Sequence, residues 1–156
     1  MVDQGRFREV LGHFATGVAV VTGQGPGGPL GFTCQSFTAL SLDPPLVLIA
    51  PARSSSSWPL IAASGAYCVN VLAADQEALA LGFSVSGGDK FAGVGYHAGP
   101  SGSPIIDGAL AYVDCRIEAV HEAGDHLVAI GAVVELGHGE GRPLLYYRSG
   151  FVGLER

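Results

Sequence analysis

The chain carries little charge, and positive charge is especially scarce. Only 14% of its 156 residues are charged, and 8 Lys or Arg residues stand against 14 Asp or Glu residues, for a formal net charge of −6. The basic residues are scattered along the chain and form no local cluster. Because a nucleic-acid surface needs a concentrated basic excess to neutralise phosphates, we expect no nucleic-acid partner.

Long apolar runs are also absent. No uninterrupted stretch reaches membrane-spanning length, and the first residues, MVDQGRFREV, lack the apolar core of a signal peptide. We therefore expect a cytoplasmic protein with no membrane partner. The length, together with 48% apolar residues, predicts that residues 1–156 form one domain around a sizeable core.

Metal-binding and nucleotide-binding motifs are missing as well. The three cysteines (Cys34, Cys68 and Cys115) are far apart, and the five histidines show no ligand spacing, so we expect buried free thiols and no metal. No Walker loop, HExxH helix or GxSxG elbow occurs. Gly23, Gly25 and Gly28 spell G-x-G-x-x-G, but Pro29 and a second strand follow where a helix should begin, which indicates a hairpin loop. An enzyme of this kind would need an organic cofactor for difficult chemistry.

Glycine, in contrast, is abundant. The chain has 24 glycines and nine prolines, which favours a barrel with many tight turns over a helical bundle. We predict six or seven strands, within residues 18–22, 30–38, 46–50, 67–72, 111–119, 127–136 and 144–154, the last of these a strand–turn–strand. Short helices are expected at 6–15, 57–64 and 75–81. Because strands and helices do not alternate regularly, an antiparallel barrel is favoured over a doubly wound parallel sheet.

Four segments support more detailed expectations. Residues 6–15 place Phe7, Val10, Leu11 and Phe14 on one face of an amphipathic helix. The Gly-, Ser- and Pro-rich residues 84–108 indicate a long surface loop. From 111 onwards, small and apolar residues alternate with an outer polar face of Asp114, Arg116 and Glu118, and the nearly all-apolar segment 127–136 is expected to be covered on both sides.

Residues 31–58 carry the most information about function. The strand GFTCQSFTAL has small polar residues where a half-buried strand ordinarily carries Val or Ile, which leaves room for a flat ring to meet backbone N–H and C=O groups. Arg53 and a run of four serines then precede a predicted helix, so hydroxyls, amides, the helix dipole and a guanidinium would together bind an anion. A ring-sized gap beside a phosphate site fits a flavin nucleotide. A polar strand followed by a flexible serine-rich loop accounts for the same residues without a ligand.

The stretch GFTCQSFTALSLDPPLVLIAPARSSSSW closely resembles the signature of the flavin reductase-like family. The likeness continues through residues 66–72, 89–93, 103–115, 124–126 and 143–155, and so covers nearly the entire chain. It is closest to the reductase components of two-component aromatic hydroxylases, including the one that acts on the phenolic ring of degraded steroids. The resemblance implies a mainly β fold, an antiparallel Greek-key split barrel that binds FMN, with a few short helices. It also implies a homodimer with its flavin site near the subunit interface.

The resemblance further implies roles for individual residues. Neighbours of the isoalloxazine and ribityl chain would be Thr33, Cys34, Gln35, Ser36 and Phe37. The phosphate, or the pyrophosphate of FAD, would be held by residues from the segment 51–58, namely Pro51, Ala52, Arg53, Ser54, Ser55, Ser57 and Trp58. Lys90 and Phe91 would close over the cofactor, although Lys90 fits a solvated loop lysine equally well.

The implied catalytic residue is His126, which would lie beside the nicotinamide and also bind that substrate. An imidazole there can donate to the carboxamide or sit where negative charge grows on the flavin. A histidine at the start of a strand, held by Asp125, accounts for the same sequence. The implied pyridine-nucleotide contacts at the C-terminus are Arg148, Ser149, Gly150 and Phe151, and an ordinary surface ion pair is the other interpretation of Arg148.

Taken together, these features predict an NAD(P)H-dependent flavin reductase. NADH or NADPH would deliver hydride to FMN or FAD, and the reduced flavin would diffuse to a separate oxygenase. Two alternatives stay open. One is a flavin-binding module without fast reductase activity. The other is a split-barrel oxidase of the pyridoxamine-phosphate type, although its basic substrate pocket is hard to find among eight scattered positive residues.

Overall fold

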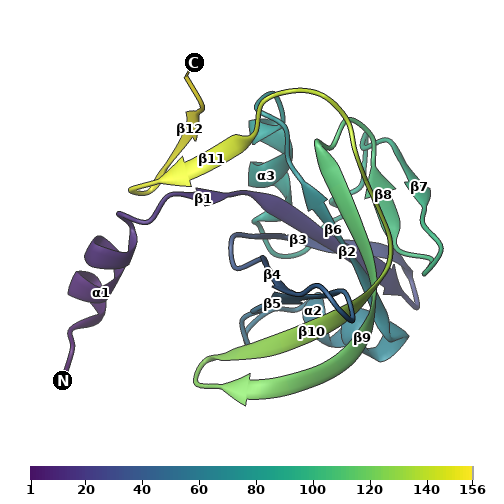
Figure 1. The fold of residues 1–156 in the computed structure, drawn as a ribbon, viewed down its shortest axis with the longest axis horizontal. Helices are drawn as coiled ribbons and strands as arrows, with labels where there is room; N and C mark the ends of the chain where they lie inside the picture. Colours follow the sequence, from purple (N-terminus) through teal and green to yellow (C-terminus); the bar gives the residue numbers. More distant parts are fainter. Residues whose placement is uncertain (156) are drawn as a thin grey trace.

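A seven-stranded antiparallel sheet forms the centre of the molecule, with strand order β3-β2-β6-β9-β10-β5-β4 (Figure 1). The computed structural model describes residues 1–155, which contain twelve strands and three helices. In chain order these are α1 (Gln4–Leu11), β1 (Thr16–Gly17), β2 (Ala19–Gly25), β3 (Gly28–Cys34), β4 (Thr38–Ser41), β5 (Leu46–Ile49), α2 (Trp58–Ser64), β6 (Ala66–Val71), α3 (Glu77–Phe83), β7 (Tyr96–Ala98), β8 (Pro104–Ile106), β9 (Ala111–Ala123), β10 (His126–His138), β11 (Leu144–Tyr147) and β12 (Gly150–Gly153).

The large sheet curls into a barrel that stays open along one seam. β3 and β4 are its two edge strands, yet only residues 35–37 separate them along the chain. Extended backbone covers at most about 3.6 Å per residue, so this link spans roughly 14 Å and keeps the two edges close together. No ladder of hydrogen bonds joins β3 to β4 within the described residues. The antiparallel barrel predicted from the sequence is therefore present, with an opening at β3/β4.

The core has two parts, one on each face of β2. Ala19 and Val21 pack with Ile49, Tyr67 and other residues inside the barrel. Val18 and Val20 point to the opposite face. There they pack in a second cluster that includes Leu72, Ala80, Phe83, Phe91, Ile106 and Leu144, contributed partly by α3 and the segment after it. This two-residue alternation makes β2 the shared wall of both clusters.

Several element boundaries differ from the sequence prediction. The strand expected at 30–38 is broken, because β3 ends at Cys34 and the chain crosses the barrel opening before β4. The helix expected at 75–81 begins two residues later, since Gln76 Oε1 accepts the Ala73 N–H (2.9 Å) and holds a turn there. The expected long loop at 84–108 contains a small antiparallel sheet of β7 and β8. The total of twelve strands exceeds six or seven because several have only two to four residues.

The expectation of an outer polar face on β9 is wrong for Asp114. Arg116 and Glu118 are exposed, but Asp114 is fully buried. Its carboxylate accepts the Ser101 N–H (2.8 Å) and the Ser101 hydroxyl (2.5 Å). The carboxylate therefore fastens the turn between β7 and β8 onto β9, and its burial is compensated by these two bonds.

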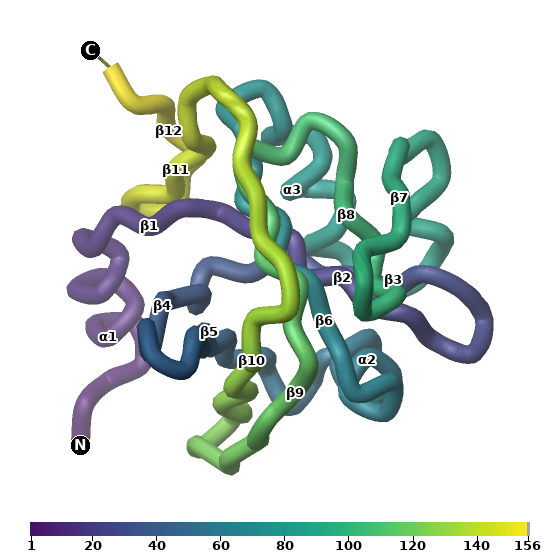
Figure 2. Tube along the Cα trace, turned by 45° about the vertical axis from the view of Figure 1, so that its right-hand side comes forward, coloured from purple at the N-terminus to yellow at the C-terminus, as the bar shows by residue number. Residues whose placement is uncertain are grey.

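Two apolar surfaces that a packed core would cover are instead exposed. Along β10 only Ala129 and Gly131 are buried, while Val134 and Leu136 are exposed. The prediction that segment 127–136 is covered on both sides is therefore wrong for the single chain. α1 forms at the predicted place but buries none of its residues. It stands apart from the barrel at the left of Figure 1, beside the small sheet β1-β11-β12 that Figure 2 shows next to it.

None of the helices in residues 1–155 is long and apolar enough to span a membrane.

Candidate functional site

The barrel opening leads into a cleft of about 490 Å³, within the size range of small-molecule and cofactor sites. Its walls come from the edge strand β3 and the link that follows it, the loop between β5 and α2, the end of α3 with the next residues, and the start of β10. The lining residues are Phe32, Thr33, Cys34, Gln35, Ser36, Ala50, Pro51, Ala52, Ser54, Ser55, Ser56, Ser57, Phe83, Ser84, Val85, Ser86, Lys90 and His126.

The β3 wall of the cleft is an unpaired strand edge. β3 is hydrogen-bonded to β2 on one side only, so within residues 1–155 the main-chain groups on its other side have no strand partner. One of them, the Gly31 carbonyl, accepts a hydrogen bond from Lys90 Nζ (3.2 Å), which also donates to Phe83 O (3.4 Å). A side chain at Gly31 would press on Phe83, since an added Cβ would lie 3.0 Å from the ring. The absence of a side chain there lets α3 and Lys90 close against the strand.

The hydroxyls of Thr33 and Ser36 have structural partners. Thr33 Oγ1 donates to Ala80 O (2.6 Å) and fastens α3 to β3. Ser36 Oγ accepts the Ala50 N–H (2.9 Å), which joins the link across the opening to the end of β5. These bonds set the width of the cleft on two sides. The thiol beside them, Cys34, is buried, and that burial raises its pKa, so it stays protonated at neutral pH.

The serine-rich loop turns four consecutive residues, 54–57, into the cleft. Ser57 occupies the predicted N-cap of α2 but makes no capping bond with its side chain. Ser55 Oγ instead accepts the Trp58 N–H (3.1 Å). Because α2 has only seven residues, anion binding here depends on the serine hydroxyls and on Lys90 more than on a helix dipole.

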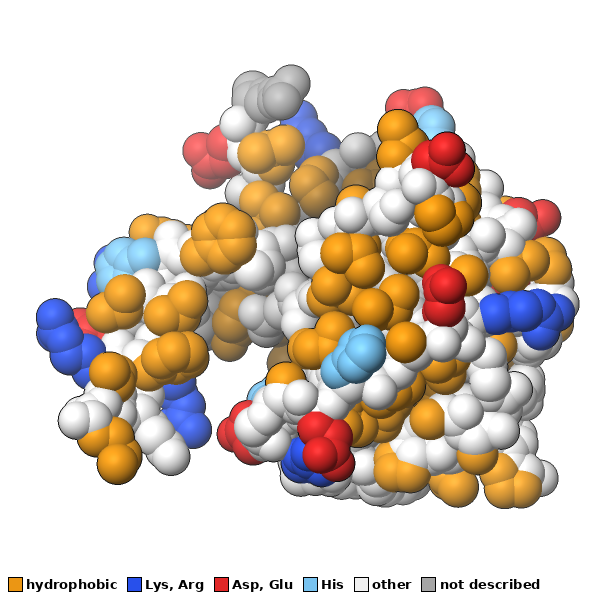
Figure 3. Space-filling model, turned by 60° about the horizontal axis from the view of Figure 1, so that its bottom comes forward, with side chains coloured by type: hydrophobic (Ala, Val, Ile, Leu, Met, Phe, Trp, Pro, Cys, Tyr) orange, Lys and Arg blue, Asp and Glu red, His pale blue; other side chains and the backbone are white. Residues whose placement is uncertain are grey.

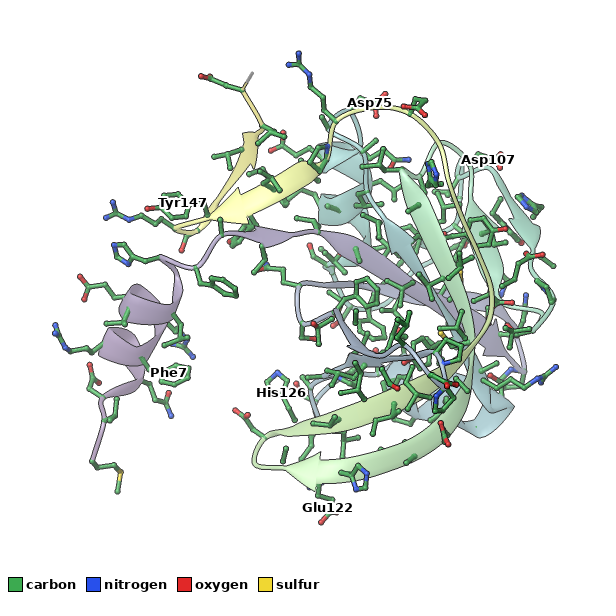
Figure 4. All side chains as sticks on the ribbon, viewed as in Figure 1. Phe7, Asp75, Asp107, Glu122, His126 and Tyr147 are labelled. Carbon is green, nitrogen blue, oxygen red and sulfur yellow. The ribbon has the colours of Figure 1, made fainter. Side chains whose placement is uncertain are left out.

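Arg53 points away from the serines. Its Nε donates to Gly124 O (2.8 Å), its backbone N–H donates to Asp125 O (3.0 Å), and its guanidinium lies 3.4 Å from Glu122. Gly124 and Asp125 form the β9–β10 turn and Glu122 lies near the end of β9, in the region where Figure 4 labels Glu122 and His126. Arg53 therefore braces the turn that carries His126, and it does not line the cleft.

His126 begins β10 at one end of the cleft. It forms a bridge with Ala52, and its Nδ1 lies 2.7 Å from Asp125 Oδ1. An ionised carboxylate only accepts hydrogen bonds, so Nδ1 carries the proton of this bond and Nε2 is left for a ligand. The same bond lowers the pKa of Asp125 below its usual value, which keeps that carboxylate ionised at neutral pH.

Lys90 is the one cation among the residues that line the cleft. Partial burial lowers the pKa of its ammonium group. A cation that has lost part of its water shell beside a run of hydroxyls is a strong partner for a phosphate oxygen. Its neighbour Phe91 is buried in the core against Phe83, with ring centroids 4.9 Å apart, and lies outside the cleft lining.

The structure thus brings together most, but not all, of the predicted site. Eleven of the predicted residues line the cleft: Thr33, Cys34, Gln35, Ser36, Pro51, Ala52, Ser54, Ser55, Ser57, Lys90 and His126. Phe37 instead lines a neighbouring cavity next to β1 and β2, and Trp58 is buried against Phe32 and Tyr67. The residues Arg148, Ser149, Gly150 and Phe151 form the β11–β12 turn and the strand after it, where Arg148 N–H donates to Gly12 O (3.0 Å) beside α1.

Ser56, which belongs to the serine run predicted to bind an anion, also lines the cleft. The lining residues that were not predicted from the sequence are Phe32, Ala50, Phe83, Ser84, Val85 and Ser86. Residues 84–86 open the Gly-, Ser- and Pro-rich segment that the sequence marks as a long loop. Phe32, Ala50 and Phe83 are apolar residues in or beside regular elements, so only their position in space identifies them.

Comparisons with known proteins identify the family and the fold. Residues 11–155 match the model of the flavin reductase like domain. The chain is 51% identical over 155 residues to the flavin-dependent monooxygenase reductase subunit HsaB of Rhodococcus jostii, covering 99% of this chain and 80% of that protein. The crystal structure of nitrilotriacetate monooxygenase component B from Mycobacterium thermoresistibile superposes with a TM-score of 0.95, at 49% identity and with 98% and 87% of the two chains covered.

A further solved structure is the NADH:FAD oxidoreductase SgcE6 of Streptomyces globisporus, in complex with NAD and FAD fragments. It gives a TM-score of 0.93 at 36% identity, with 98% of this chain and 93% of that chain covered. The shared architecture confirms the mainly β split-barrel fold. With nearly its whole length matched, the chain belongs to the flavin reductase like family.

Proposed function

We propose that this protein is an NAD(P)H-dependent flavin reductase that takes FMN or FAD in the β3/serine-loop cleft and supplies reduced flavin to a separate oxygenase. The observation that carries the proposal is the cleft itself, where an unpaired strand edge, a run of serine hydroxyls and the single lysine converge. A bound flavin supplies the redox chemistry, accepting hydride from the nicotinamide of NADH or NADPH.

The donor set of the cleft fits such a ligand. The bare edge of β3 offers main-chain groups to the polar rim of a flat heterocycle, and Phe32, Phe83 and Val85 give apolar contact. Ser54, Ser55, Ser56 and Lys90 present hydroxyls and a positive charge suited to a phosphate. None of these side chains has to act as a nucleophile, so the protein contributes positioning and electrostatics.

His126 is the side chain best placed to orient the nicotinamide. Its ring is fixed through Nδ1 by Asp125, and Nε2 is available to a ligand at the cleft end. In the neutral ring Nε2 accepts a hydrogen bond, and in the protonated ring it donates one and brings positive charge near the reduced flavin. Either form holds a partner group in place during hydride transfer.

Stopped-flow reduction of bound flavin by NADH tests this role. The His126→Ala substitution is expected to slow reduction by about 10-fold to 100-fold, because a positioned polar partner is lost. Flavin affinity, measured by fluorescence quenching, should stay within about twofold because the serines and Lys90 remain. Reduction traces unchanged by the substitution would remove His126 from the mechanism. Flavin binding without NADH or NADPH oxidation in the wild-type protein would instead favour a flavin-binding module.

Two similar proteins support the proposal that reduced flavin is supplied to a separate oxygenase. The Rhodococcus jostii relative is named as a reductase subunit of a flavin-dependent monooxygenase, and the Mycobacterium thermoresistibile structure as a monooxygenase component. By this analogy, reduced flavin leaves the cleft and reaches its partner by diffusion. The open barrel seam provides an exit, since no ladder of hydrogen bonds joins β3 to β4 in the described part of the chain.

We propose that a second copy of the chain packs against α1 and buries its exposed apolar side chains. Phe7 and Phe14 on this helix are 57% and 76% exposed, and an isolated helix of eight residues is not stable in water. Figure 3 shows apolar side chains on the α1 lobe at the left and on the body across the notch. A homodimer would cover these surfaces and would bring the partner's β11–β12 hairpin, with its Arg148-Ser149 turn, toward a pyridine nucleotide.

A further inference from the structure

A second cavity, of about 250 Å³, continues from the flavin cleft past the serine loop. Ser56, Ser57 and Lys90 line both cavities, so the two share a wall at the point where the phosphate is expected. Beyond that wall, the second cavity is bounded by the β2–β3 hairpin, by α2 and by the loop at 87–89. The flavin cleft therefore has room for a ligand that extends beyond one phosphate.

We propose that this second cavity receives the adenosine half of FAD, so that the protein binds FAD in preference to FMN. The inference rests on the proposed function, because it extends the same flavin site. FMN ends at the phosphate beside the serines and Lys90, whereas FAD carries a second phosphate and an adenosine that need further space.

The cavity walls suit an aromatic base on a sugar. Pro29, Leu30 and Leu60 give an apolar surface, and Leu60 is 43% exposed although it is a leucine at the first turn of α2. Covering such a side chain with a flat base removes apolar area from water and stabilises the complex. Gly87 and Gly88, which also line the cavity, adopt left-handed backbone conformations (φ +79° and +72°), where side chains are disfavoured. This side of the cavity stays open to main-chain contact.

The charges at the shared wall match a pyrophosphate. Lys90 Nζ lies between the cavities, held by Gly31 O and Phe83 O, and is the only cation that lines either one. The one acidic residue of the second cavity, Asp89, accepts the Phe91 N–H (3.1 Å) and so bends back into its own turn. The second oxygen of this carboxylate can still accept a hydrogen bond from a ribose hydroxyl.

NADH and NADPH also carry an adenosine diphosphate, so the adenosine in the second cavity could come from FAD or from the pyridine nucleotide. The position of the cavity decides between the two. The cleft joins the second cavity at its Lys90 and serine end. His126, beside which the nicotinamide is expected, lines the same cleft but not the second cavity, and it also lines a third cavity together with Phe7 and Arg8 of α1. Figure 4 shows Phe7 and His126 on opposite sides of this gap. The nicotinamide is therefore expected at the end of the cleft away from the second cavity, which is left for the flavin.

The test compares binding of FAD, FMN and riboflavin by fluorescence quenching in wild-type protein and in Leu60→Asp. Wild-type protein should bind FAD about tenfold tighter than FMN. Leu60 lines the second cavity but not the flavin cleft, so Leu60→Asp replaces the apolar wall for the base with a carboxylate beyond the end of FMN. The change is expected to weaken FAD about tenfold while FMN stays within about twofold. Leu81→Asp, at an exposed leucine of α3 outside both cavities, is the matched control and should change neither constant.

Each other outcome overturns the proposal in a distinguishable way. Equal affinities for FAD and FMN, unchanged by Leu60→Asp, would show that the second cavity is not used by flavin. If Leu60→Asp raised the KM for NADH, measured with FMN as acceptor, and left the FAD affinity unchanged, the cavity would be assigned to the pyridine nucleotide instead. Absence of binding by all three flavins would refute the flavin site itself, and with it the function on which this inference rests.

Discussion

Arg53 shows how a single side chain at the cleft acts through its neighbours. Its hydrogen bonds to the main chain of Gly124 and Asp125 tie the β9–β10 turn to the start of the serine loop, and the next residue in that turn is His126. The ion pair with Glu122 contributes little because both side chains are well exposed. Arg53 is therefore a positioning residue, and its loss should affect the nicotinamide end of the cleft.

The Arg53→Gln substitution tests this assignment. The catalytic efficiency kcat/KM for NADH should fall about threefold to tenfold, because one side-chain hydrogen bond that holds the turn is lost. The dissociation constant of FMN should change less than about twofold. Arg116→Gln, at an exposed arginine on β9, is the control and should leave both values unchanged. A drop in FMN affinity with no drop in riboflavin affinity would show that Arg53 binds the phosphate directly.

Residue identity alone could not separate these roles. The sequence placed Thr33, Ser36 and Arg53 at the site, and all three are near it, but each hydrogen-bonds to the protein's own main chain. A hydroxyl or guanidinium suits a phosphate and a carbonyl equally well. The serines were predicted from their local run and Lys90 from the family resemblance, whereas Phe32 and Phe83 meet in the cleft only through long-range packing.

At the scale of elements, β9 connects the barrel wall to the segment that lies over it. Asp114 pairs across to Cys68 on β6 and to Glu135 on β10, while its carboxylate holds the Ser101 turn. A carboxylate that accepts from a backbone N–H and from a hydroxyl makes stronger bonds than a neutral amide oxygen. This single buried carboxylate fixes the β7–β8 segment relative to the large sheet.

Replacing Asp114 by Asn should therefore lower the free energy of unfolding by about 1–3 kcal/mol, because the amide offers a donor where Ser101 also donates. Glu118→Gln makes the same chemical change at an exposed position of the same strand and should stay within about 0.5 kcal/mol. Urea unfolding followed by circular dichroism measures both. Equal losses for the two variants would contradict the structural role assigned to Asp114.

Periodicity explains why elements were predicted better than their ends. Strands such as Leu46–Ile49 and Ala66–Val71 stand out as short runs of apolar and β-branched residues, and they form within one residue of the expected places. The break between β3 and β4 has no such signal, because it depends on where the barrel opens. The burial of Asp114 likewise depends on a turn that lies over it from outside the sheet.

At the scale of the whole molecule, one chain forms the whole barrel but leaves apolar side chains exposed on its outer surface. Phe7, Val10, Leu11 and Phe14 on or beside α1, and Val134 and Leu136 on β10, are exposed apolar residues. The sequence predicted an apolar helix face and an apolar strand correctly, but it could not tell whether their cover comes from the same chain. A second copy provides that cover in the dimer proposed above.

Light scattering during size-exclusion chromatography tests the dimer. Wild-type protein should elute at twice the chain mass of 15.9 kDa. The double substitution Phe7→Ser/Phe14→Ser removes two large apolar side chains from the interface and should shift the mass toward one chain. Leu81→Ser, an exposed leucine on α3, should leave the mass unchanged. A monomeric wild-type protein would show that α1 is not covered by a second copy.

The central claim is that the cleft between the β3 edge and the serine loop binds a flavin nucleotide. Titration of FMN and FAD with purified protein, followed by visible absorption and flavin fluorescence, tests it most directly. We predict a saturable spectral change that the Lys90→Met variant, which keeps the apolar stem and removes the charge, weakens about tenfold. The absence of any spectral change with either flavin, up to concentrations on the order of 1 mM, would contradict the account.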